Sequence, residues 1–171
     1  MATPRTDARA PTPRWFGLLL LSVVLGTFVL ILLGGYVKAL GAGLACPEWP
    51  SCEGGTLTTT QTDKGYSQQQ VAAEVVHRAV ASIVGVLVLL CAAASWRLRD
   101  VRPAVRTPIL LSLPVLLIQI GLGGWTVTGG LQPLVVTAHL GMATIFFTLW
   151  VIAAVVTLDP RVRHPSEAVV S

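Results

Sequence analysis

The stretch VAAEVVHRAVASIVGVLVLLCAAASW, residues 71–96, decides the fold of this chain. It is long and apolar enough to cross the hydrocarbon core of a bilayer as a helix, which takes about 20 residues. Near its start it nevertheless carries a histidine, His77, and a similar stretch at residues 133–158 carries His139. Ionisable side chains are costly inside a bilayer, so these histidines indicate a functional site.

Two further apolar blocks, residues 15–40 and 108–128, complete a set of four. Of the 171 residues, 53% are hydrophobic and only 12% are charged, a balance too apolar for a soluble domain. Open sheets cannot satisfy their backbone in lipid, so each block is expected to be a helix. The sequence predicts an all-α integral membrane protein, a four-helix transmembrane bundle over residues 15–158 between disordered tails at 1–14 and 159–171.

Arginines are concentrated in three segments, namely the two tails and the connection after the second block (Arg5, Arg9, Arg14, Arg97, Arg99, Arg102, Arg106, Arg161 and Arg163). The loop at residues 41–70 is mostly acidic in its charges. By the positive-inside rule, both termini and the middle connection are cytoplasmic and this outer loop faces outward. The net charge of +4 is therefore explained by the arginines that orient the chain in the membrane. We expect a multi-pass plasma-membrane protein that binds no nucleic acid.

A short motif recurs near the outer ends of the first and third blocks. LGGYV at residues 33–37 resembles LGGWT at residues 122–126, and each is followed by a loop and a histidine-bearing helix. The chain is therefore predicted to contain two parallel helix-hairpin repeats, with His77 and His139 facing each other. The glycine pairs allow close approach of either a neighbouring helix or a flat cofactor, and both interpretations stay open.

Each histidine stands 19 residues before the last apolar residue of its stretch, so the two imidazoles lie at matching depth. Neutral imidazole is a good axial ligand of haem iron, and helix bundles often hold cofactors between facing helices. We expect His77 and His139 to bind one haem iron. Haem propionates are anionic, and Arg78 and Lys38 are the cations at suitable depth.

Glu74 lies one helical turn before His77, on the same helix face. A carboxylate against a haem edge can accept a proton or stabilise a cationic intermediate, as oxidation of a porphyrin substituent requires. In the alternative interpretation, Glu74 and Arg78 form an interfacial ion pair that only anchors the helix. The protein would then be a bis-histidine haem b electron-transfer protein in the membrane, or a scaffold without haem.

The chain has three cysteines. Cys91 is deep in an apolar block and is expected to be a buried packing residue. Cys46 and Cys52 share the outer loop, on the oxidising side of the membrane, where a disulfide persists. A disulfide, structural or redox-active, is favoured over a metal site because the loop holds no other thiol or histidine.

Several motifs, in the same order, resemble the haem A synthase family. EVVHR at residues 74–78 matches that family's E-x-x-H-R element. The first helix and outer loop (GGYV, then GAGLACPEWPSC, within residues 34–52) are similar to those of the family. So are QIGLGGWTV at residues 119–127 and LQPLVVTAHL at residues 131–140. The resemblance covers about residues 15–158.

The resemblance implies oxidation of the C8 methyl group of haem O to a formyl group by successive hydroxylation, which gives haem A for terminal cytochrome oxidase. It implies that Glu74 is the catalytic carboxylate and that His77 and His139 are the ligands of substrate haem O or cofactor haem b. Cys46 and Cys52 would be the cysteine pair that the family links to disulfide formation.

Typical members of that family have eight membrane helices and two histidine pairs, one for substrate haem and one for cofactor haem. Four helices with one pair resemble the half-length members, so we expect a homo-oligomer to supply what the second half does. Haem O synthase and the cytochrome oxidase assembly machinery are further expected partners.

Overall fold

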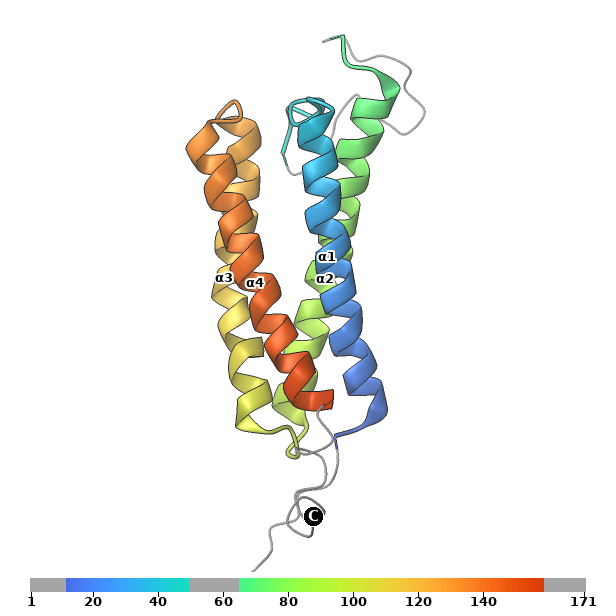
Figure 1. Cartoon of the computed structure of the whole chain (residues 1–171), viewed down its shortest axis with the longest axis vertical. Coiled ribbons are helices and arrows are strands. Elements are labelled where there is room, and N and C mark those ends of the chain that lie inside the picture. Colours follow the sequence, from blue (N-terminus) through green and yellow to red (C-terminus); the bar gives the residue numbers. More distant parts are fainter. Residues whose placement is uncertain (1–11, 50–64, 159–171) are drawn as a thin grey trace, which may run out of the picture.

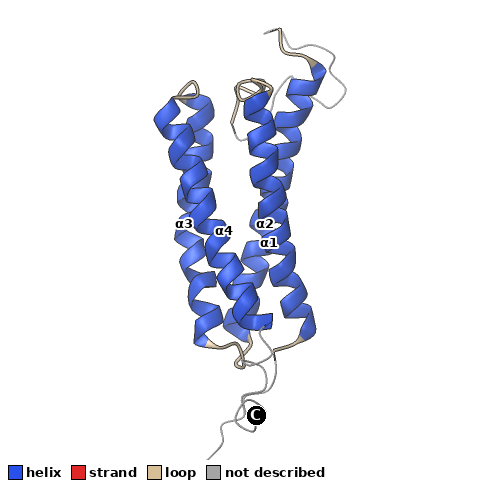
Figure 2. Ribbon diagram, viewed as in Figure 1, coloured by secondary structure: helices blue, strands red, loops and turns tan. Residues whose placement is uncertain are grey.

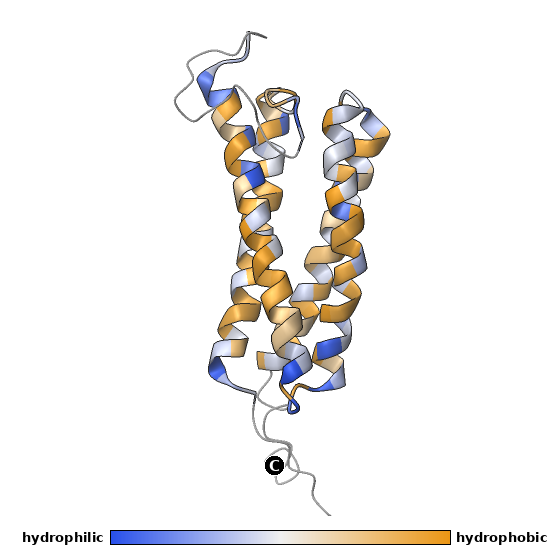
Figure 3. Cartoon of the chain, turned by 180° about the vertical axis from the view of Figure 1, so that it is seen from behind, coloured by the Kyte–Doolittle hydropathy of each residue, from blue (hydrophilic) through white to orange (hydrophobic). Residues whose placement is uncertain are grey.

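The computed structural model describes residues 12–49 and 65–158, and this part of the chain forms four helices. Their bounds are α1 Arg14–Ala39, α2 Gln68–Arg97, α3 Pro103–Thr128 and α4 Pro133–Leu158. All four are long and apolar enough to cross a membrane. Hydrophobic residues run along the middle of every helix, and hydrophilic residues lie mostly near the helix ends (Figure 3). The prediction of an all-helical, multi-pass membrane protein is confirmed. The predicted tails lie almost wholly outside the described residues.

The helices pair as two hairpins, α1 with α2 and α3 with α4 (Figure 1). The start of α1, the end of α4 and the short α2–α3 connection lie together at one end of the bundle, called here the terminal end. The α1–α2 and α3–α4 connections lie at the opposite end, called the loop end. The two hairpins are close at the terminal end and diverge toward the loop end (Figure 2).

A hydrophobic core joins all four helices in the half nearer the terminal end. Phe16 and Leu20 of α1, Cys91 of α2 and Trp150 of α4 are completely buried in it. The ring centroids of Phe146 and Trp150 are 6.1 Å apart in this core. Cys91 is a free, buried cysteine, as the sequence predicts.

Each helix also has an interval in which no residue is fully buried. In the order α1 to α4 these intervals are residues 28–36, 75–83, 113–123 and 136–145. They lie between the core and the loop end, and both histidines fall within them. The four helices are therefore least tightly packed at the depth of the histidines.

Helix α2 begins with a capping box that the predicted start at Val71 misses. The Ser67 hydroxyl accepts a hydrogen bond from the Gln70 backbone N–H at 3.4 Å, and the Gln70 side chain accepts one from the Ser67 N–H at 2.9 Å. These bonds satisfy donors that a helix start leaves unpaired. The helix therefore begins at Gln68.

Helix α3 begins at Pro103, not at Pro108 as the apolar pattern predicts. Proline suits the first position of a helix because its missing N–H has no partner there in any case. Pro108 and Pro114 both lie inside the continuous helix. Arg106 is consequently a helical residue, and its guanidinium donates hydrogen bonds to the Ser95 carbonyl at 3.0 Å and the Leu98 carbonyl at 2.9 Å.

Candidate functional site

Each histidine packs against a glycine of its own hairpin. A Cβ added at Gly34 of α1 would lie 3.2 Å from Cε1 of His77 and 3.8 Å from its Nδ1. A Cβ added at Gly123 of α3 would lie at the same two distances from Cε1 and Nδ1 of His139. Such contacts are tighter than almost all real Cβ contacts, so only glycine admits the ring without a shift. The recurring glycine motif thus accommodates the imidazoles.

The two imidazoles lie in matching intervals of α2 and α4, between the hydrophobic core and the loop end. In both rings Nδ1 is buried and has no hydrogen-bond partner within residues 12–49 and 65–158. Nδ1 is therefore enclosed against the protein in both rings.

The carboxylate of Glu74 is buried near this site, with only 5% of the residue exposed. Its Oε1 accepts a hydrogen bond from Nε of Arg78 at 3.0 Å, so the predicted ion pair is present. Glu74 precedes His77 by less than one helical turn. Glu74 therefore pairs with Arg78 and also stands beside His77. The ion pair does not exclude a role of the carboxylate in catalysis.

Arg78 also holds the connection that follows α1. Its two terminal nitrogens donate hydrogen bonds of 2.6 Å to the backbone carbonyls of Glu48 and Cys46. The guanidinium thus joins α2, its own carboxylate partner and the loop. A role of Arg78 at a haem propionate stays a prediction.

The start of this loop reaches from the first hairpin to the second. Ala42, Ala45 and Cys46 are buried against α1 and α2. Trp49 packs on α3, where a Cβ added at Gly124 would lie 3.0 Å from Cε2 of the indole. The loop therefore connects the two hairpins at the loop end, where they diverge most.

Three sequence-predicted residues are less closely tied to the site. Lys38 is exposed in the last turn of α1, at the loop end, and its role toward a propionate stays a prediction. Cys46 is buried in the loop, but Cys52 lies outside the described residues. The pairing of these two cysteines therefore also stays a prediction.

Gln119 of α3 is a site residue to which the sequence pattern assigns no role. Its amide nitrogen is 3.5 Å from Nε2 of His139, and its Oε1 is buried without a hydrogen-bond partner. It stands one turn before Gly123, on the same helix face. The sequence feature that could identify Gln119 is its polar side chain within an apolar stretch, four residues before Gly123.

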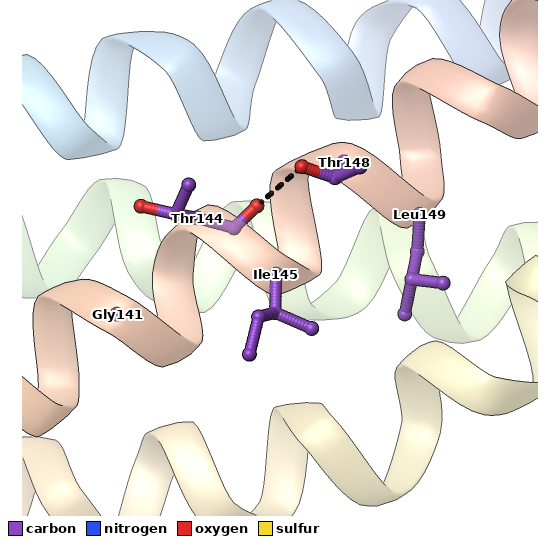
Figure 4. Close-up of a pocket in the computed structure, with 5 residues that line it drawn as sticks. All are labelled: Gly141, Thr144, Ile145, Thr148 and Leu149. Carbon is purple, nitrogen blue, oxygen red and sulfur yellow. Dashed lines mark hydrogen bonds between the residues drawn. The ribbon is translucent and has the colours of Figure 1, made fainter.

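Two surface hollows lie on the helices that carry the histidines. One, of about 430 Å³, is lined by residues of α4, where Ile145 and Leu149 point toward α3 while Thr144 and Thr148 lie on the side of α1 (Figure 4). The other, of about 280 Å³, is lined by Ser82, Ile83, Val86 and Leu87 of α2. Counted from His77, these four residues stand at the same sequence intervals as Thr144, Ile145, Thr148 and Leu149 do from His139. The two hairpins therefore match beyond their histidines.

The donor set suits a haem better than a bare metal ion. In the described part of the chain, no group of three or more His, Cys, Asp or Glu side chains is placed to hold a metal. His77 and His139 would be the residues that hold a haem iron. The glycine contacts that set each ring and the enclosed Nδ1 atoms fit this arrangement.

Comparison with known proteins agrees with this site. Residues 17–170 match the COX15-CtaA family model, described as cytochrome oxidase assembly protein. The chain belongs to the COX15-CtaA family. It is similar to a heme A synthase of Shewanella oneidensis, at 35% identity over 127 residues that cover 67% of this chain and 37% of that protein. A heme A synthase of Shouchella clausii is 31% identical over 124 residues, covering 72% of this chain and 39% of that protein.

This COX15-CtaA chain is also similar to a second kind of protein. Protoheme IX farnesyltransferase 1 of Natronomonas pharaonis is 33% identical over 137 residues, which cover 80% of this chain and 27% of that protein. The chain thus spans roughly a third of the length of these curated relatives. No solved structure matches it.

Proposed function

We propose that this COX15-CtaA protein is a haem A synthase, which oxidises the C8 methyl group of haem O to a formyl group. The observation that carries the proposal is the pair of equivalent glycine–histidine contacts beside a buried carboxylate. The similarity to proteins named heme A synthase supports it. Two successive hydroxylations of one carbon, each a two-electron oxidation that needs an external electron acceptor and an oxygen atom from water or dioxygen, would give a gem-diol, which loses water to leave the aldehyde.

His77 and His139 are the proposed iron ligands, one from each hairpin. The matching glycine contacts and the matching hollows support two parallel repeats. The distribution of arginines supports both termini on the cytoplasmic side. The bound haem supplies the redox chemistry. The chain supplies two imidazoles whose orientation is set by Gly34 and Gly123.

Glu74 is the proposed catalytic carboxylate. Arg78 engages its Oε1, while no described residue hydrogen-bonds to its Oε2. The ion pair therefore fixes the carboxylate and leaves one oxygen to accept a proton from the reacting group. Only 5% of Glu74 is exposed, so the residue as a whole is largely shielded from bulk water.

The loop end is the proposed site of the haem propionates, on the outer side of the membrane. Lys38 lies there as an exposed cation, and the loop with Cys46 covers this end. The chain carries one histidine pair, so a separate cofactor haem requires a second four-helix unit. We infer that a second copy of this chain supplies it. Haem O synthase is the proposed source of substrate, and oxidase assembly the proposed destination of haem A.

Co-expression with a haem O source, followed by chromatography of the extracted haems, tests this function. The wild type is expected to yield haem A or its hydroxylated precursor, and Glu74→Ala to yield neither while retaining bound haem. Asp100→Ala, a carboxylate at the terminal end, is the control and should match the wild type. Haem binding without any oxidised product from the wild type would instead support the bis-histidine electron carrier.

A further inference from the structure

The two histidine sites differ in the residue one helical turn before each glycine, as well as in Glu74 and Arg78, which flank only His77. The glycine contacts are the same in both hairpins, but the residue one turn before the glycine is Leu30 in α1 and Gln119 in α3. Leu30 has no group that can hydrogen-bond to His77. Gln119 places its amide 3.5 Å from Nε2 of His139. Within the described residues, Nε2 of His139 therefore has a polar side-chain partner, and Nε2 of His77 has no hydrogen-bond partner.

Gln119 opposes iron binding in either orientation of its amide. If the amide N–H donates to Nε2, it occupies the lone pair that iron needs. If the amide oxygen instead accepts from a protonated Nε2, the imidazole is held in the tautomer that cannot bind iron through this atom. The buried, unpartnered Oε1 of Gln119 is available for the second arrangement. Both arrangements must be broken before His139 binds iron through Nε2.

We propose that Gln119 is a positioning residue that competes with haem iron for Nε2 of His139. His77 is then the primary haem ligand, and His139 is the ligand that exchanges. This inference rests on the proposed haem ligation and assigns the two histidines different tasks. Because His139 exchanges, a haem can enter and leave the site on that side. His77 holds the haem while it is bound.

The size of the effect follows from the contact. A separation of 3.5 Å is long for a hydrogen bond, so its contribution lies at the lower end of the usual range. Removal of the amide should therefore raise the affinity of His139 for iron by about twofold to fivefold. His77 should not respond, because Gln119 does not touch it.

Single-histidine variants separate this effect from a general structural one. In His77→Ala the remaining proposed iron ligand is His139, and in His139→Ala it is His77. Purified haem-free protein in detergent is titrated with haem b, and the dissociation constant is read from the Soret band. Gln119→Leu should tighten haem binding about twofold to fivefold in the His77→Ala background and leave the His139→Ala background unchanged.

The first hairpin offers the matched control. Leu30→Gln introduces the same amide beside His77, so it should weaken haem binding in the His139→Ala background and leave His77→Ala unchanged. Gln119→Met serves as a second variant of similar length without a donor, should Gln119→Leu fail to fold.

Two results would overturn the inference. Equal changes in both backgrounds would make Gln119 a structural residue, and an unchanged affinity in His77→Ala would exclude competition at Nε2. Both results presuppose a wild type that binds haem. A wild type with no Soret band would instead overturn the proposed function, and this inference with it.

Discussion

His139 lies against Gly123 so closely that a methyl group at the glycine would come within 3.2 Å of the ring Cε1. His77 and Gly34 repeat this contact at the same distance in the other hairpin. In each hairpin the glycine contact limits the orientations that the ring can take. The relationship links the recurring glycine motif to the chemistry of the site.

The first prediction concerns these glycines. Gly34→Ala and Gly123→Ala should each displace an imidazole, at a cost of about 1–3 kcal/mol for the forced contact. Haem affinity should fall correspondingly, as measured by titration at the Soret band. Gly35→Ala and Gly121→Ala are matched controls, because a Cβ at either position meets nothing within 4 Å.

The controls should bind haem as the wild type does and should be slightly more stable, since alanine favours a helix by up to about 1 kcal/mol over glycine. If Gly123→Ala bound haem as tightly as Gly121→Ala, the glycine contact would have no part in positioning His139.

The second prediction concerns Arg78, which joins α2 to the loop. Arg78→Ala removes the partner of a buried carboxylate together with two hydrogen bonds to loop carbonyls. Breaking a buried ion pair costs about 3–5 kcal/mol, so thermal unfolding in detergent should shift to clearly lower temperature. Arg78→Lys should recover part of the loss, because one ammonium cannot reproduce the three contacts of the guanidinium.

Lys38→Ala is the control for the loss of a cation at the same end of the bundle. Lys38 is exposed, so its removal should leave the unfolding temperature almost unchanged. Equal shifts for Arg78→Ala and Lys38→Ala would contradict the proposed role of Arg78 in holding the loop.

The third prediction concerns the contact of Trp49 with Gly124 across the two hairpins. Trp49→Ala removes the indole, and Gly124→Ala pushes on it through a Cβ 3.0 Å away. Each should lower the unfolding temperature. Because both act on one contact, the double variant should be less destabilised than the sum of the two single variants. Strict additivity would show that the residues do not interact.

The fourth prediction concerns the terminal end. Arg106→Ala removes two hydrogen bonds to carbonyls at the end of α2, and hydrogen bonds to charged groups are worth about 1.5–3 kcal/mol each. Stability should fall while the haem spectrum is unchanged, since the site lies in the other half of the bundle. Arg99→Ala, at an exposed position of the α2–α3 connection, should have little effect on either measurement.

The sequence predicts the parts of this structure that depend on local chemistry. Four membrane-spanning helices follow from the length of the apolar blocks, and the histidines stand out because ionisable groups are costly in lipid. The Glu74–Arg78 pair follows from helical spacing, and the structure contains it. The prediction that α3 starts at Pro108 is wrong, because Pro103 provides the first helical position and the helix continues through Pro108.

Contacts between distant segments could not be predicted in this way. The reach of Arg78 to the Cys46 carbonyl and the packing of Trp49 on α3 depend on how a loop folds over the bundle. Gln119 meets His139 only because α3 and α4 pair in this register. A single glutamine in an apolar helix has no spacing pattern that identifies its partner.

The ligation of one haem by both histidines is tested most directly by the spin state of the ferric haem in the purified protein, measured by low-temperature electron paramagnetic resonance. The wild type should give a low-spin signal, as two axial imidazoles require, and both His77→Ala and His139→Ala should lose it in favour of a high-spin signal. A low-spin signal unchanged in either variant would show that the missing histidine is not an iron ligand, and would contradict the account.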